Sequence, residues 1–269
     1  MKDRATVLVT NGNLISLIAL RQWLDENLSD LKLVVITTKL PSAKSNVRET
    51  FKILRNSGIR YCGFKLFSNL FFPLFLKIIG RPYNIQSYIR NTGIRVVRTE
   101  NVNDPAVIAK IKSSSPDILL SFSATTKFCA ELISASKRVS INLHYALLPK
   151  YAGLSPYFWY LFNHEKTSGC TLHVISDVLD AGNVIEMRSF AMNGCNSVAS
   201  VLLQQTKLVS PMLNDFYKGK TSENSLTKQN LSERSYFRHP TKGQAVVFNK
   251  SSHEYITFED AREILNLVS

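Results

Sequence analysis

The sequence lacks the signatures of several common catalytic sites. None of its four cysteines belongs to a CxxC pair or shows the spacing of metal ligands, so we expect no metal site. It has no HExxH zinc motif, no GxGxxG dinucleotide fingerprint and no P-loop. Ser155 lacks the glycine pattern of a nucleophile elbow. These absences exclude zinc hydrolysis, dinucleotide chemistry of the usual type and a Ser-His-Asp nucleophile.

The sequence also lacks a long apolar run, and we expect no leader. Its most apolar stretch, residues 70–76, contains Pro73 and is far shorter than the roughly 20 residues that span a bilayer. Residues 1–10 begin with charges and run straight into a strand, unlike a signal peptide. A chain of 269 residues can build its core without disulfides, so we expect a reducing, cytoplasmic setting.

Acidic residues are scarce between residues 39 and 98, where twelve Lys or Arg accompany Glu49 alone. This stretch therefore carries +11 of the formal net charge of +13. The surplus predicts an anionic partner, which is a nucleic acid, an acidic membrane or a phosphorylated small molecule. Within it, residues 64–79 mix aromatic side chains with lysines. We expect these residues to pack as a helix pair on the core or in a homodimer, with attachment to an acidic membrane surface as the alternative.

Buried-type strands alternate with helical patterns through most of the chain. Apolar β-branched runs separated by helices predict βαβ units, and hence an α/β, Rossmann-like, mostly parallel sheet. We expect one main domain at 1–220 and a small C-terminal appendix at 221–269. The predicted strands are 6–10, 33–37, 94–97, 118–122, 139–143, 170–175 and 184–190, with a short one at 245–248. A helix is predicted at 197–217, with Pro211 kinking or splitting it, and another at 258–267.

An amide, an imidazole and a carboxylate point to one reaction class. Asn142 and His144 lie two residues apart at the end of a buried strand, so their side chains share a side. Asp180 lies in a turn-like Leu-Asp-Ala-Gly between two strands. Ligands of open α/β sheets bind beyond the carboxyl ends of the strands. The three groups therefore suit direct acyl transfer without a covalent enzyme intermediate.

Four motifs occur in order between residues 142 and 182. They are Asn142-x-His144, Leu147-Leu148-Pro149-x-Tyr151-x-Gly153-x-x-Pro156, Gly169-x-Thr171-x-His173 and Asp180-x-Gly182. In this order and spacing they resemble the formyltransferases that use 10-formyltetrahydrofolate. That family includes glycinamide ribonucleotide transformylase, methionyl-tRNA formyltransferase and nucleotide-sugar N-formyltransferases. The resemblance implies the formyltransferase fold and formyl transfer with 10-formyltetrahydrofolate as donor.

Carried over onto this sequence, the resemblance implies a catalytic trio of Asn142, His144 and Asp180. The amide and the protonated imidazole would stabilise an oxyanion, while the carboxylate would position the imidazole and help the attacking amine lose its proton. His173 is expected to be structural. The folate pocket is expected at Phe128, Ile133, Asp177 and Leu179, the last two through their backbone. Candidates for acceptor contacts are Asn11, Tyr145, Tyr151 and Trp159, although turn formation by Asn11 and packing of the aromatic rings remain open.

The acceptor is expected to be an amino sugar linked to a nucleotide, an anionic substrate that the basic surplus suits. The family commonly has Pro-Ser where this chain has Tyr145-Ala146, and a basic residue where it has Ala152, so acceptor identity is the open question. About fifty residues follow Lys218, which is short for the barrel of the methionyl-tRNA enzyme. The alternatives are another small amine such as a ribonucleotide or amino acid, methionyl-tRNA, or an inactive module that binds nucleic acid, which we do not expect.

Overall fold

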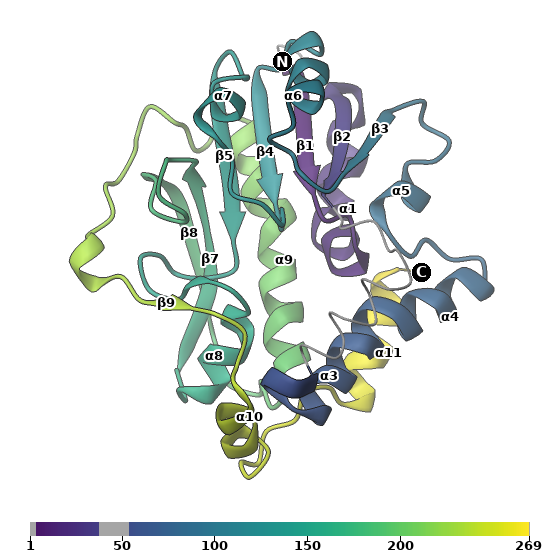
Figure 1. Cartoon of the computed structure of the whole chain (residues 1–269), viewed down its shortest axis with the longest axis vertical. Helices are drawn as coiled ribbons and strands as arrows, with labels where there is room; N and C mark the ends of the chain where they lie inside the picture. The colour runs from purple at the N-terminus through teal and green to yellow at the C-terminus, as the bar shows by residue number, and fades with distance from the viewer. Residues whose placement is uncertain (1–3, 38–53, 269) are drawn as a thin grey trace.

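A seven-stranded sheet organises the chain (Figure 1) in this computed structural model, which describes residues 4–37 and 54–268. The strand order is β3-β2-β1-β4-β5-β7-β8. The first five strands in this order are mutually parallel, and β7 alone runs antiparallel, to both of its neighbours β5 and β8, so the predicted α/β class with a mostly parallel sheet is confirmed. The strands are β1 (Thr6–Thr10), β2 (Leu31–Thr37), β3 (Arg95–Thr99), β4 (Ile118–Phe122), β5 (Val139–His144), β7 (Thr167–Val174) and β8 (Val184–Ala191).

Helices cover both faces of the sheet because its central strands are apolar on both sides. On one face, Trp23 and Phe216 join the core that includes Leu120 of β4. On the other face, Ile111 packs with Val9 of β1. The first face carries α1 (Leu14–Asn27), α5 (Ile85–Tyr88) and α9 (Val198–Tyr217), and the second carries α6 (Pro105–Ser113) and α7 (Ala130–Ile133).

Two smaller clusters lie beyond the sheet and involve the C-terminal residues. One is aromatic and joins Phe158 and Trp159 to Phe248 and Tyr255. The other joins α4 to α11 through Leu76 and neighbouring apolar side chains. The remaining elements are η1 (Leu28–Asp30), α3 (Ile59–Leu66), η2 (Phe67–Phe71), α4 (Phe72–Ile78), β6 (Ala152–Gly153), α8 (Pro156–Phe162), η3 (Leu231–Glu233), β9 (Tyr236–Phe237), α10 (Lys242–Phe248) and α11 (Phe258–Leu267). A domain boundary at residue 220 stays a prediction.

One local prediction is wrong and a second is wrong in part. The expected strand at 245–248 is the last part of helix α10, where Thr241 and Gln244 form a capping box and only one side of the run is buried. A four-residue apolar run has no period by which a strand and a helix turn can be told apart. The expected split at Pro211 is absent, because α9 is continuous through it and the residues on either side remain packed in the core. A kink at Pro211 stays a prediction.

Residues 39–53 of the basic stretch lie outside the described part of the chain. The same holds for most of the helix that the sequence predicts at 42–56. From residue 54 onward the stretch continues through α3, η2 and α4 to β3.

Candidate active site

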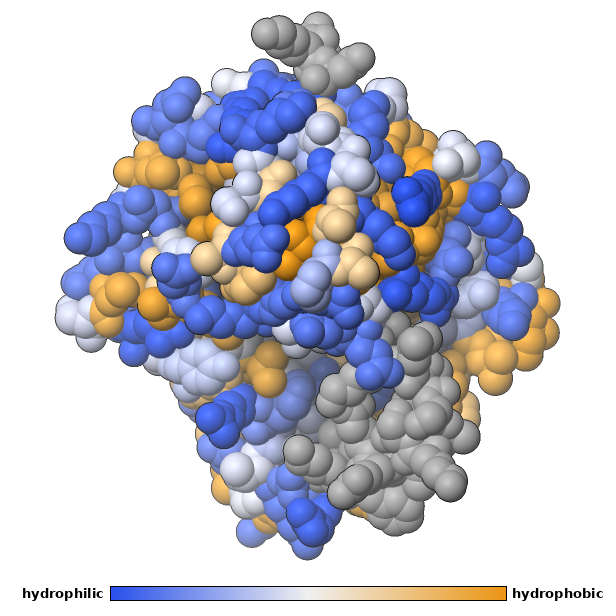
Figure 2. Space-filling model, turned by 45° about the horizontal axis from the view of Figure 1, so that its top comes forward, coloured by the Kyte–Doolittle hydropathy of each residue, from blue (hydrophilic) through white to orange (hydrophobic). Residues whose placement is uncertain are grey.

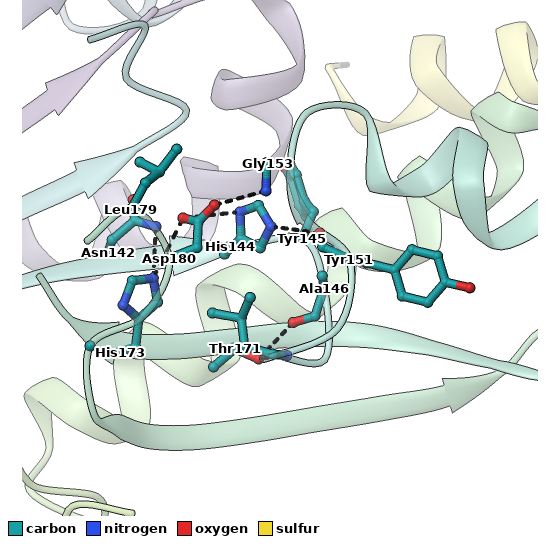
Figure 3. A network of polar contacts seen from close by, with 12 residues as sticks. Asn142, His144, Tyr145, Ala146, Tyr151, Gly153, Thr171, His173, Leu179 and Asp180 are labelled. Atoms are coloured by element: carbon teal, nitrogen blue, oxygen red, sulfur yellow. Dashed lines mark hydrogen bonds and ion pairs between the residues drawn. The ribbon is translucent and has the colours of Figure 1, made fainter. Parts of the chain in front are cut away.

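Strand β5 places two of the predicted catalytic side chains at the carboxyl end of the sheet. Asn142 pairs with Ser121 of β4 and with His173 of β7, and His144 is the last residue of the strand. Their spacing of two residues sends both side chains to the same side (Figure 3). Asp180 reaches them from the connection between β7 and β8. The structure therefore brings together the trio that the sequence predicts.

His173 orients the Asn142 amide. Asn142 Nδ2 donates to His173 Nε2 over 3.1 Å, and His173 Nδ1 donates to the Val174 carbonyl over 2.9 Å. Burial lowers the pKa of His173 to about 4, so its ring is neutral near pH 7 and Nε2 is an acceptor. One N–H of the amide is thereby used, while the second stays available to a ligand.

Both ring nitrogens of His144 face oxygen atoms. Nε2 lies 3.2 Å from the Tyr151 carbonyl oxygen, which can only accept, so Nε2 is the donor of that contact. Nδ1 lies 3.7 Å from Asp180 Oδ1, which is too far for a hydrogen bond, so this edge of the ring is not tied to the carboxylate. The His144 side chain retains 12% of its exposure, which leaves that edge accessible.

Asp180 is held in an unusual backbone conformation by its neighbours. It has φ 53° and is 7% exposed, and its Oδ2 accepts a hydrogen bond from the Gly153 N–H over 2.9 Å. Two residues later, a Cβ on Gly182 would come within 1.8 Å of the Val174 carbonyl oxygen, so only glycine fits there. The Asp-Ala-Gly turn therefore needs glycine as its third residue, because the two backbones approach each other so closely there.

The residues that clamp this turn were not predicted from the sequence. Gln229 is buried, and its Nε2 donates to the carbonyls of Asp180, over 3.2 Å, and Gly182, over 2.6 Å. Arg234 Nη2 donates to the Leu179 carbonyl over 2.9 Å. Both residues lie in the polar segment after α9. That segment carries no motif, so its sequence does not indicate which side chains return to the turn at Asp180.

The loop after β5 is also clamped from a distance in sequence. Thr171 of β7 accepts from the Leu148 N–H over 3.1 Å and donates to the Ala146 carbonyl over 2.6 Å. Strand β6 pairs in parallel with β9. Gly153, at φ 97°, allows this pairing, since a Cβ there would lie 2.3 Å from the Phe237 carbonyl oxygen. The C-terminal part of the chain thus holds the loop that contacts both His144 and Asp180.

Three of the four expected acceptor contacts are packed inside the protein. Tyr145 lies in the main core, edge-on to Phe122 at 5.4 Å. The Tyr151 ring stacks on other aromatic rings, and the Trp159 Nε1–H donates to the Arg238 carbonyl over 2.9 Å. Asn11 Oδ1 accepts from the Asn13 N–H over 3.1 Å and from the Ser16 hydroxyl over 2.8 Å, as in a turn. Acceptor contacts by these four side chains stay predictions.

The expected folate residues fall into two groups. Phe128 is buried and Ile133 partly buried, both in the core beneath α6. Asp177 and Leu179 lie in the exposed connection that leads to Asp180, and Leu179 retains 40% of its exposure. Leu179 therefore offers apolar surface directly beside the carboxylate (Figure 3), while a folate contact by any of the four stays a prediction.

A second polar network, missed in the sequence, starts two residues after Gly153. Ser155 Oγ lies 3.0 Å from His239 Nδ1 and 3.1 Å from Tyr61 Oη. Lys65 of α3 donates to Tyr157 Oη over 2.7 Å. Burial alone would raise the pKa of Tyr157, but the charge and hydrogen bond of Lys65 outweigh burial and lower it. The basic helix α3 is thereby tied to the start of α8, next to the loop that contacts the trio.

The trio can stabilise negative charge that develops on an oxygen. It presents a free amide N–H and an edge of the His144 imidazole, with a carboxylate beside them. Across residues 4–37 and 54–268, no group of three or more His, Cys, Asp or Glu is arranged to hold a metal ion.

Comparison with known proteins agrees with this geometry. Residues 74–201, which contain the trio, match the family model described as formyl transferase. Among solved structures, an N-formyltransferase from Helicobacter canadensis in complex with folinic acid and dTDP-3-aminofucose is 19% identical, with a TM-score of 0.55 over 87% of this chain and 70% of that chain. A likely sugar N-formyltransferase from Mycobacterium tuberculosis is 17% identical, with a TM-score of 0.55 over 99% and 88%. Glycinamide ribonucleotide transformylase 1 from Symbiobacterium toebii is 12% identical, with a TM-score of 0.56 over 86% and 96%. At such identities these likenesses establish the fold, so the predicted formyltransferase fold is confirmed.

Proposed function

The chain is a formyltransferase with its formyl transferase domain over residues 74–201, and from this premise we propose that it formylates the amino group of a nucleotide-linked amino sugar. The formyl donor is 10-formyltetrahydrofolate. The single observation that carries the proposal is the juxtaposition of Asn142, His144 and Asp180 at the carboxyl end of β5.

The acceptor amine attacks the formyl carbon, and the new C–N bond turns the formyl oxygen into an oxyanion. The second N–H of Asn142 and the Nδ1–H of His144 stabilise this charge, which is absent from the starting carbonyl. The bond from the formyl carbon to the folate nitrogen then breaks. The proton released by the attacking amine ends on that nitrogen, with Asp180 beside the path.

The donor is proposed to lie against the connection before Asp180. Val178 and Leu179 expose 51% and 40% of their surface there, an apolar edge suited to a flat ring system. The Helicobacter canadensis protein of the same fold was solved with folinic acid, a formylated folate, and with dTDP-3-aminofucose. That pair of ligands supports a folate donor and a nucleotide-linked amino sugar as acceptor for this chain.

The charge of the chain favours an anionic acceptor. Its surplus of +13 suits the phosphates of a nucleoside diphosphate sugar. A ribonucleotide amine shares that charge, so the test must separate the two. Purified enzyme is incubated with 10-formyltetrahydrofolate and with 3-amino or 4-amino sugars on nucleoside diphosphates, or with an amino ribonucleotide, and release of tetrahydrofolate is followed.

We expect release with at least one amino-sugar nucleotide and a loss of about 10²–10³-fold in kcat for His144→Ala, as for other oxyanion donors. The matched control is His164→Ala, a histidine outside the trio at the end of α8, which should leave kcat unchanged. Release with the ribonucleotide alone would reassign the acceptor. Release from none of them above the His144→Ala background would contradict the proposal.

A further inference from the structure

One surface of the basic region exposes large apolar side chains in a row. Helix α3, the π-helical turn η2 and helix α4 follow one another without a gap from Ile59 to Ile78. One side of this run is buried, with Phe64, Phe72 and Leu76 at most 8% exposed. The other side bears what we call the apolar ridge, made of Leu70 (53% exposed), Phe71 (57%), Leu74 (50%), Phe75 (46%), Ile78 (76%) and Ile79 (46%).

The ridge residues form a continuous stripe. They occur in pairs that repeat every four positions, which is the spacing that keeps side chains on one face of a helix. In Figure 2, hydrophobic colour gathers at the right-hand edge of the molecule, the side on which Figure 1 places α4. Single exposed apolar residues are ordinary on a protein surface, whereas six in one stripe mark a surface that is covered by a partner.

The stretch of sequence that carries the ridge has charges of one sign. From residue 54 to residue 99 the chain has eight Lys or Arg and no Asp or Glu. Lys77 and Arg81, at the end of α4, are exposed. The acidic groups on α11, the helix packed beside α4, are engaged elsewhere in part, since Glu263 pairs with Lys207 over 2.8 Å and Asp260 accepts from Ser197 Oγ over 2.6 Å.

This pattern selects between two kinds of partner. A symmetric pair of chains joined at the ridge would bring the positive charges of both copies into one interface, which is unfavourable. An anionic bilayer surface instead offers hydrocarbon for the aromatic and aliphatic side chains and phosphate for the lysine and arginine. No helix in the described ranges 4–37 and 54–268 is long and apolar enough to cross a membrane.

We propose that the apolar ridge inserts into the interface of an anionic membrane, with α4 lying in the membrane plane. Helix α4 lies at the edge of the molecule (Figure 1), so its exposed side can approach a flat surface. Lys65 on the preceding helix α3 contacts Tyr157 beside the catalytic loop, so ridge and site belong to one connected run. Membrane attachment would thus hold the enzyme where anionic headgroups concentrate.

The test is sedimentation of the full-length protein with vesicles of phosphatidylcholine alone or with phosphatidylserine added. The ridge variant is Phe71→Glu with Ile78→Glu, two exposed positions where a charge should not disturb folding. The matched control is Met187→Glu, a position that is 43% exposed on β8, the edge strand on the opposite side of the molecule from α4 (Figure 1). Circular dichroism melts and turnover with the formyl donor establish that both variants are folded.

We expect binding to the anionic vesicles that weakens as salt rises, and a drop of about tenfold or more in partitioning for the ridge variant. Met187→Glu should bind like the parent protein. The proposal is overturned if the parent protein does not bind anionic vesicles at low salt, or if the ridge variant binds as well as the parent. A dimer in light scattering that the ridge variant dissociates, together with no vesicle binding, would assign the ridge to a second copy instead.

Discussion

Replacing Asp180 by asparagine changes one atom of the site and removes the negative charge beside His144. The Gly153 N–H, 2.9 Å from the carboxylate, needs an acceptor and will take the amide oxygen of Asn. The amide NH₂ then faces His144 Nδ1 in place of the carboxylate oxygen now 3.7 Å away. An N–H at that place repels an N–H of the ring instead of attracting it, so the imidazole becomes a poorer donor to the oxyanion.

Loss of one oxyanion donor typically lowers kcat by about 10²–10³-fold. We expect Asp180→Asn to lower kcat by a factor in that range or somewhat smaller, with little change in KM. The fold should survive, since the turn keeps its hydrogen bond to Gly153. Tetrahydrofolate release under saturating donor and acceptor measures kcat, and a thermal melt checks folding. An Asp180→Asn enzyme that keeps more than about a tenth of the parent kcat would refute the role assigned to the Asp180 carboxylate beside His144.

Three further changes test the supports of the site. Because burial lowers the pKa of His173 to about 4 while an unfolded histidine titrates near 6.5, its contribution to stability is present above pH 6.5 and is lost as pH falls. The unfolding free energy should drop by about 2 kcal/mol from this group between pH 7 and pH 5, and His173→Gln should remove that part of the slope in urea titrations at each pH. Gly153→Ala should lower stability by about 2–4 kcal/mol and reduce kcat, since its Cβ would meet a β9 carbonyl oxygen at 2.3 Å. A melting temperature of Gly153→Ala within about 1 °C of the parent value would contradict this prediction, because it would show that the loop moves to accommodate the Cβ. Gln229→Ala leaves the Asp180 and Gly182 carbonyls without their donor and should cost about 1–3 kcal/mol and weaken turnover, which parallel urea titrations and rate assays would measure.

The surplus positive charge has two separate placements in the described structure. Lys65 is turned inward, where it donates to Tyr157 and lies over the Tyr61 and Tyr157 rings at 5.5 and 5.3 Å. Lys77 and Arg81 are turned outward beside the apolar ridge. The same basic stretch therefore supplies a support for the catalytic loop and a rim for the proposed membrane contact.

Local pattern was sufficient for most of the elements. The apolar β-branched runs at 6–10 and 118–122 are strands with the predicted bounds, and the helix at 258–267 begins behind the Thr257 cap. The pattern failed where tertiary contacts outweigh it. The run at 245–248 is helical because its cap and two buried residues favour a helix, and α9 continues through Pro211 because packing on both sides of it holds the helix together.

The amino-acid sequence by itself determined the fold class, the order of the strands along the chain and the identity of the trio. Period and spacing are local properties, and Asn142, His144 and Asp180 are marked by motifs. Only the tertiary structure decided which residues support that trio. Gln229 and Phe237 lie within contact of the catalytic turn and loop because the chain folds back by more than forty residues, and nothing local records such a return. Exposure of the apolar ridge was likewise a tertiary outcome, since which face of an aromatic helix is buried depends on what packs against it.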